Sequence, residues 1–193
     1  MKQQGTDTIV NAAWDARAST QPLLRAILVV LAGSAFIALS ARVQVPMWPV
    51  PMTMQTFAVL LVALAFGARL AVITVAAYLA QGAMGLPVFA GGGGLPYLVG
   101  PTAGYLYAFL AVALVVGHLG DRGWGRGFAG AFAATLAGSV LIYAIGASWL
   151  AGYVGVEQAV ALGVAPFVIG DLLKAALAAL LLPAAWKLLR TAQ

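Results

Sequence analysis

The sequence has no cysteine, a single histidine and few charged residues. Without cysteine the chain has no disulfide bond, no thiolate metal site and no catalytic thiol. The one histidine, His118, is too few for a metal site built from several histidines. Charged residues make up 8% of the 193 residues, whereas soluble domains average about 25%. We therefore expect no metal site, no cofactor and no ordinary soluble fold.

Apolar residues dominate the chain instead. They make up 63% of it, and the mean hydropathy is +1.01, as is typical of a polytopic membrane protein in a lipid bilayer. The formal net charge is +5, but the basic residues stand singly at the ends of apolar runs. That spacing indicates membrane topology and not a nucleic-acid-binding patch, so we expect no nucleic-acid partner.

The apolar runs divide the chain into a tail and one membrane domain. Residues 1–22 are polar and lack the apolar core of a signal peptide, so we expect a cytoplasmic tail with Trp14 at the membrane interface. Residues 23–190 are expected to form one all-α membrane domain. A single span over residues 57–84 would place Arg69 at its centre, at a cost of about 2.5 kcal/mol or more, so we divide this run into two spans. We predict six spans: 23–41, 57–66, 70–84, 102–119, 128–153 and a last one that begins at 166.

The basic residues also predict the orientation of the spans. With the amino terminus inside, the inner segments carry eight basic residues and the outer segments carry only Arg42. This asymmetry predicts that both termini are cytoplasmic. Residues 42–55, residues 85–100 and the start of the last span then lie on the outer side. The eight inner basic residues are Lys2, Arg17, Arg25, Arg69, Arg122, Arg126, Lys187 and Arg190.

Both outer loops have unusual compositions. Residues 42–55 hold three prolines and Trp48, which prevents a continuous helix; we expect either a cap over a pocket or an interfacial anchor through Trp48. Residues 85–101 include four consecutive glycines, 91 to 94, which no Gly-Lys-Ser/Thr follows, so a phosphate loop is disfavoured. Glycines let backbone groups approach a ligand closely, although a flexible linker is the alternative.

Two ionisable residues stand near the start of the last span. Asp171 and Lys174 are three residues apart, which on a helix places them on one face, about 5–6 Å apart at Cβ. Charges inside the membrane are costly and usually mark a functional site. The alternative is a buried ion pair that only fixes helix packing.

The first span carries a stripe of small residues that includes Ser34 and Ala38, four residues apart. Small residues at this spacing let helices approach closely. The stripe therefore predicts a face for a partner subunit, or close packing within the chain.

Four motifs resemble the BioY family, the biotin-specific substrate-binding (S) components of energy-coupling factor (ECF) transporters. They occur in the order and spacing of that family across residues 23 to 188. The motifs are Val50-Pro-Met-Thr-Met-Gln-Thr-Phe57, Gly85-Leu-Pro-Val-Phe89 with its glycine cluster, Gly100-Pro-Thr-Ala-Gly-Tyr105, and Pro166-Phe167 followed by Gly170-Asp171-Leu172 and Lys174.

The resemblance implies a six-helix S-component fold in the bacterial cytoplasmic membrane that captures biotin from outside. It also implies a transmembrane coupling protein and a pair of cytoplasmic ATPases as partners. Asp171 is then expected to accept hydrogen bonds from biotin, and Lys174 to bind an anion or a carbonyl. The other residues expected around biotin are Trp48, Gln55, Phe89, Gly91, Gly92, Tyr97, Tyr105 and Tyr143.

Two other functions stay open from the sequence. One is an S component for another small vitamin, which would differ in the two outer loops. The other is an ion-coupled secondary transporter that uses Asp171 as its carrier carboxylate. An enzyme is disfavoured because the chain has neither a nucleophile–base pair nor a nucleotide-binding motif.

Overall fold

The computed structural model describes residues 8–10 and 22–191, which are mostly helical. The predicted tail, apart from these few residues, lies outside the described residues, as do Trp14, Lys2 and Arg17. The elements are α2 (Pro22–Ser40), β1 (Gln44–Val45), β2 (Met52–Thr53), α3 (Gln55–Ala83), α4 (Pro96–Val99), α5 (Ala103–Asp121), the 3-10 helix η1 (Trp124–Arg126), α6 (Phe128–Val154), α7 (Val156–Gly163) and α8 (Phe167–Thr191).

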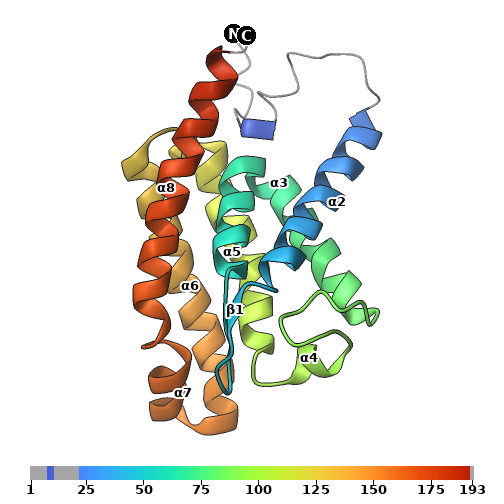
Figure 1. The fold of residues 1–193 in the computed structure, drawn as a ribbon, viewed down its shortest axis with the longest axis vertical. Coiled ribbons are helices and arrows are strands. Elements are labelled where there is room, and N and C mark those ends of the chain that lie inside the picture. Colours follow the sequence, from blue (N-terminus) through green and yellow to red (C-terminus); the bar gives the residue numbers. More distant parts are fainter. Residues whose placement is uncertain (1–7, 11–21, 192–193) are drawn as a thin grey trace.

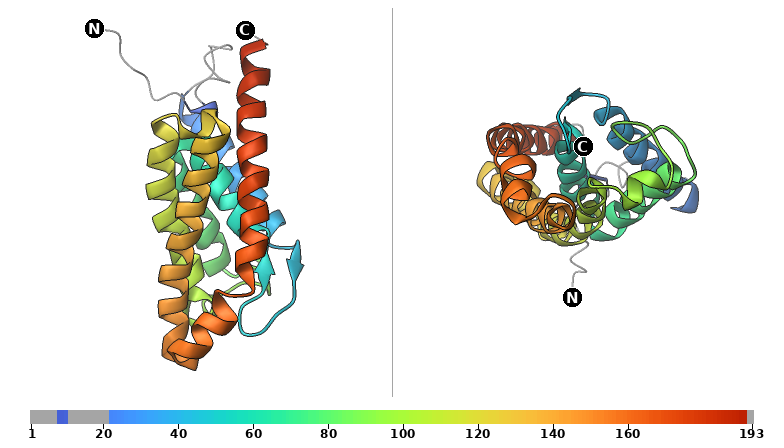
Figure 2. Two further views of the ribbon diagram at one scale, coloured as in Figure 1. Left: turned by 90° about the vertical axis from the view of Figure 1, so that its left-hand side faces the viewer. Right: turned by 90° about the horizontal axis from the view of Figure 1, so that it is seen from below.

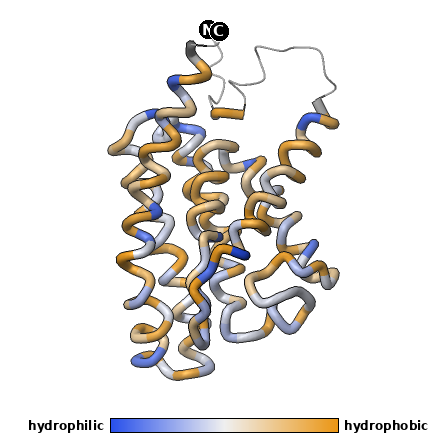
Figure 3. Tube along the Cα trace, viewed as in Figure 1, coloured by the Kyte–Doolittle hydropathy of each residue, from blue (hydrophilic) through white to orange (hydrophobic). Residues whose placement is uncertain are grey.

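Five helices of the described chain, α2, α3, α5, α6 and α8, are long and apolar enough to cross a membrane. Apolar residues colour most of their length in Figure 3, and many large apolar side chains on them are exposed, including Leu28, Leu39 and Leu180. Exposed apolar surface of this extent suits lipid contact and not water. The predicted membrane class is therefore confirmed at the level of several spanning helices.

Helix α3 contains both spans predicted between residues 57 and 84. It runs for 29 residues, but Gly67 has φ 78° and ψ 169°, so the helical path is broken there. A positive φ of this size favours glycine. On the far side of the break, the Ala68 N–H donates to Asp121 Oδ2 at 3.1 Å. In Figure 1 the chain runs up the teal half to this corner and back down the green half.

The spanning helices pack side by side along one axis (Figures 1 and 2). Helix α5 lies against α3 and α6, while α8 packs mainly on α6 and α2 packs on α3. The core between them includes many small and branched apolar side chains, such as Ala63, Val75, Val112 and Ile142. This packing leaves α2 and α8 at the outside of the bundle.

The β hairpin and the short helices α4 and α7 gather at one end of the bundle, which we call the loop end. It holds the antiparallel β1–β2 hairpin, with Gln44 opposite Thr53, together with α4 and α7 (Figure 1). The start of α2 and the end of α8 lie at the opposite end. The loop of residues 42–55, where we expected no continuous helix, contains this hairpin.

Candidate functional site

A cavity of about 380 Å³ opens at the loop end. This volume lies within the usual range for small-molecule sites, about 300–1,000 Å³. Its walls come from residues 48–56, from the loop around Phe89 and from helices α5, α6 and α8. The lining residues are Trp48, Pro49, Val50, Pro51, Thr53, Gln55, Thr56, Phe89, Ala90, Gly91, Pro96, Tyr97, Gly100, Pro101, Thr102, Tyr105, Leu106, Phe109, Ile142, Tyr143, Phe167, Asp171 and Lys174.

Asp171 and Lys174 form an ion pair in the wall of this cavity. Lys174 Nζ lies 2.7 Å from Asp171 Oδ1, and both side chains are buried. The spacing of three residues brings them together on the first turns of α8, as the sequence predicted. The structure thus confirms that they share a helix face.

Each N–H of the Lys174 ammonium group has an acceptor. Nζ donates to Asp171 Oδ1 at 2.7 Å, to the Thr53 carbonyl at 2.8 Å and to Thr56 Oγ1 at 3.0 Å. An ammonium group has three donors, so these bonds use all of them. Lys174 is therefore held between β2, the first turn of α3 and its own helix.

Asp171 accepts hydrogen bonds on both of its oxygens. Oδ1 accepts from Lys174 and from the Thr56 hydroxyl, the latter at 3.2 Å, while Oδ2 accepts from the Tyr143 hydroxyl at 2.5 Å. A carboxylate offers about four acceptor positions, so three bonds leave room for one more. The remaining acceptor position is on Oδ2, the oxygen that accepts from Tyr143.

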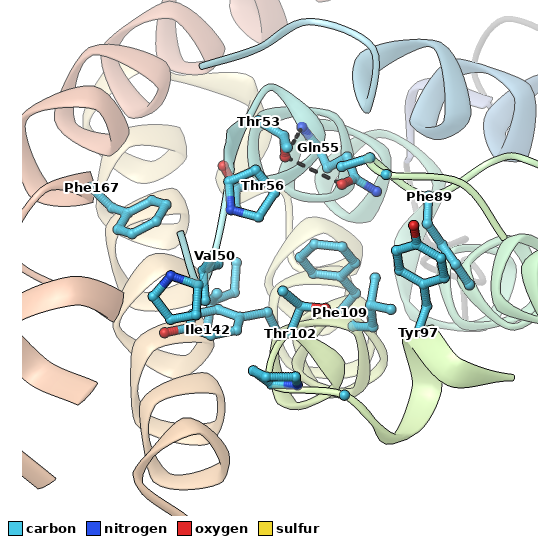
Figure 4. A pocket seen from close by; sticks show the side chains of 18 of the residues that line it. Val50, Thr53, Gln55, Thr56, Phe89, Tyr97, Thr102, Phe109, Ile142 and Phe167 are labelled. Carbon is cyan, nitrogen blue, oxygen red and sulfur yellow. Dashed lines mark hydrogen bonds between the residues drawn. The ribbon is translucent and has the colours of Figure 1, made fainter. Parts of the chain in front are cut away.

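Aromatic side chains enclose the remainder of the cavity. The ring of Phe89 is buried and lies 5.5 Å from that of Tyr78, edge to face, and 5.9 Å from that of Tyr97. In Figure 4, Phe89 and Tyr97 stand on one side of the cavity and Phe167 on the other. Aromatic walls of this kind pack against flat apolar rings.

Gln55 belongs to a chain of hydrogen bonds that joins the hairpin to residues 85–101, which we call the glycine loop. Its Oε1 accepts from the Thr53 hydroxyl at 3.3 Å (Figure 4), and its Nε2 donates to the Tyr78 hydroxyl. Tyr78 in turn donates to the Val88 carbonyl at 3.3 Å. These hydrogen bonds fix the orientation of the Gln55 amide, which lines the cavity.

The glycine loop is ordered by its own backbone and by the hairpin. Phe89 and Gly92 exchange two backbone hydrogen bonds, of 2.8 and 3.1 Å. Arg42 donates to the Pro87 carbonyl, and Gln44 Nε2 donates to the Ala90 carbonyl at 3.2 Å. These bonds tie residues 42–55 to residues 85–101, which disfavours the flexible linker.

The predicted ligand residues fall into different positions around the cavity. Gly91 lines it, whereas Gly92 only supports the loop behind it. Trp48 lines the cavity with a side chain that is 79% exposed, so it stands at the mouth. Tyr105 lines the cavity, and its hydroxyl donates to the Gly163 carbonyl at 2.8 Å.

Sequence reasoning did not select several lining residues. Thr56 has the clearest role, because it bonds to both charged groups. Its place next to Gln55 in the first resemblance motif was the signal that could have found it. Phe167 likewise stands in the last motif. Phe109, Leu106 and Ile142 are apolar residues within long apolar runs, where no sequence signal marks them.

The predicted partner-facing residues pack largely inside the chain. Ser34 is 1% exposed, and its hydroxyl accepts from Gln81 Nε2 at 3.1 Å. Ala38 is partly buried against the core. Gln81 lies on the second half of α3, so the placement of Ser34 favours the internal-packing alternative for this stripe.

Comparisons with known proteins agree with the geometry. The BioY family profile matches residues 9–191. The chain is 41% identical over 150 residues to the probable biotin transporter BioY of Pyrococcus horikoshii, covering 76% of this chain and 88% of that protein. It is 43% identical over 150 residues to the biotin transporter BioY of Thermotoga maritima, covering 77% and 88%.

A solved structure shares the fold. It is the S-component for biotin from an ECF-type ABC transporter, with a TM-score of 0.77 and 25% sequence identity over 88% of this chain and 95% of that one. With a family profile over residues 9–191 and relatives above 40% identity, the chain belongs to the BioY family.

Proposed function

We propose that this chain is the S component of an ECF-type biotin transporter and that it captures biotin in the cavity at the loop end. One observation carries the proposal: in a chain of the BioY family, a buried Asp171–Lys174 pair faces a cavity of suitable volume. The relatives from Pyrococcus horikoshii and Thermotoga maritima are named transporters and not enzymes.

The ureido head of biotin fits the pair better than its carboxylate does. The ureido group has two N–H donors and one carbonyl acceptor. Among the described residues, Asp171 Oδ2 accepts from Tyr143 alone, so it can take a ligand N–H without losing a bond. Lys174 already uses its three donors, so a ligand carboxylate would have to displace one of its partners.

The charge balance leads to the same orientation. Asp171 and Lys174 together are neutral, and they are the only charged side chains among the described residues that line the cavity. A carboxylate beside them would be a third, uncompensated buried charge, which is costly. The neutral ureido head avoids this cost. The rings of biotin would then lie between Phe89 and Tyr97 on one side and Phe167 on the other.

The fold supports uptake from the outer side by a single membrane domain, residues 23–190. Five helices are long enough to cross a membrane, and we take the parts of α3 before and after the break at Gly67 as two separate crossings, for a proposed total of six. The start of α2 and the end of α8, which carry Arg25 and Lys187, lie opposite the loop end. Arg69 follows the break in α3 at Gly67, and Arg122 and Arg126 follow α5. Arg42 precedes the hairpin of the loop end. By the positive-inside rule, the loop end is then outside a bacterial cytoplasmic membrane and both termini are cytoplasmic.

Transport requires energy that this chain does not supply. Its sequence holds no nucleotide-binding motif. We propose that a transmembrane coupling protein and a pair of cytoplasmic ATPases provide it, as the S-component fold implies. Biotin binding itself should need neither nucleotide nor these partners.

Equilibrium binding of labelled biotin to the purified chain tests the proposal. We expect saturable binding below about 1 µM ligand without nucleotide. Competition with an excess of other vitamins distinguishes biotin from a different substrate, and dependence of uptake on a pH gradient without ATPases would indicate an ion-coupled transporter. A folded preparation that shows no saturable biotin binding would refute the assignment.

A further inference from the structure

The residues that line the cavity are buried at the Asp171–Lys174 pair and exposed at its mouth. Asp171 is 3% exposed and Lys174 8%, whereas Trp48 is 79% exposed. Gly91 and Pro96, which also line the cavity, are exposed as well. A ligand whose head reaches the pair therefore directs its other end toward Trp48 and Gly91.

The mouth offers this other end no opposite charge. Among the described lining residues, the cationic side chain is Lys174, which lies at the buried end and is paired. Arg42 stands in the neighbouring loop, but it does not line the cavity and it donates to the Pro87 carbonyl. The groups available at the mouth are neutral: the Tyr97 hydroxyl, the indole of Trp48 and the backbone of Ala90 and Gly91.

A carboxylate at such a mouth gains little from its charge. It keeps contact with water, and exposed charges in water interact weakly even with opposite charges nearby. An amide in its place retains a carbonyl acceptor and adds an N–H donor. The exchange therefore removes no ion pair that the described residues provide.

We propose that the cavity binds amides of biotin, in which the carboxyl group is joined to a small amine, about as well as it binds free biotin. This inference rests on the proposed function, since it takes the ureido head to lie at Asp171. It extends the substrate class from a carboxylic acid to tail-modified derivatives. Selectivity then resides in the head and the rings, which the buried part of the cavity contacts.

Calorimetric titration of the purified chain with four ligands tests this inference. These are biotin, its primary amide, its N-butyl amide, and the diamine analogue that lacks the ureido carbonyl. We expect both amides to bind within about tenfold of biotin, and the diamine to bind at least about a hundredfold more weakly. A loss of more than about tenfold for the primary amide, or near-native binding of the diamine, would overturn the inference.

A variant separates the tail from the head. In Lys174→Met, biotin and its primary amide should lose affinity by the same factor, because neither tail contacts Lys174. If biotin weakens while the amide does not, the carboxylate lies at Lys174 and the inference is wrong. Failure of the unmodified protein to bind biotin at all is a different result, since it removes the proposed function on which the inference rests.

Discussion

The Tyr143 hydroxyl lies 2.5 Å from Asp171 Oδ2 and donates a hydrogen bond to it. This bond joins α6 to α8 at the buried end of the cavity. It occupies one side of Oδ2 and so directs the remaining acceptor position of that oxygen. Tyr143 therefore orients the carboxylate that we assign to the biotin head.

Tyr143→Phe tests this orienting role. The substitution removes one hydrogen bond to a charged group, so biotin affinity should fall by about 1.5–3 kcal/mol, roughly ten- to a hundredfold. Isothermal calorimetry measures the loss. Ser148→Ala on the same helix is the matched control, because Ser148 is exposed and its hydroxyl donates only to the Ala144 carbonyl. Unchanged affinity in Tyr143→Phe would contradict the role.

Gly82→Ala tests how the glycine loop is seated. A Cβ at position 82 would lie 2.0 Å from Cζ of the buried Phe89 ring, so the ring must move. Overpacking of this kind costs about 1–3 kcal/mol of stability. Because Phe89 lines the cavity and Gly94 N–H donates to the Gly82 carbonyl at 2.7 Å, biotin affinity should fall as well.

The control for that substitution is Gly152→Ala. Gly152 lies within α6, and a Cβ there would meet nothing within 4 Å. Replacing a helical glycine with alanine usually stabilises by about 0.4–1 kcal/mol. Thermal unfolding and biotin titration of both variants give the comparison. If Gly82→Ala behaved like Gly152→Ala, the seating of the loop on Phe89 would be disproved.

Ser34→Leu tests whether the small-residue stripe packs internally. Ser34 is buried and bonded to Gln81, so a leucine should lower the melting temperature. Ala35→Leu, at an exposed position on the same helix, should not. Assembly with the coupling protein is measured alongside. A Ser34→Leu protein with native stability and weakened assembly would restore the predicted partner face.

Local patterns in the sequence were enough to predict several features. The spacing of Asp171 and Lys174 predicted their shared face, and the cost of Arg69 at mid-membrane predicted a division close to Gly67, where the helix breaks. The prolines of residues 42–55 predicted a loop without a continuous helix. Each of these inferences depends on residues that are close together in the chain.

Tertiary contacts could not be predicted in the same way. Thr56 and Tyr143 reach Asp171 from 115 and 28 residues away, so only the folded chain brings them together. A stripe of small residues does not say which neighbour it faces, and Ser34 faces α3 of its own chain. Aromatic character alone could not separate the exposed Trp48 from the buried Phe89.

The central claim is that Asp171 and Lys174 bind the ligand and are not only a packing pair. For a pair that only packs, removing one member strands the other at a cost of about 3–5 kcal/mol of stability, and an apolar double variant recovers much of that loss. For a binding pair, Asp171→Asn and Lys174→Met should each lower biotin affinity by about 2 kcal/mol or more.

Biotin affinity of the folded double variant Asp171→Leu/Lys174→Met tests this claim most directly. Its folding is verified by thermal unfolding before the titration. Our account predicts a protein that is well folded and does not bind biotin. A double variant with native stability and near-native affinity would contradict it.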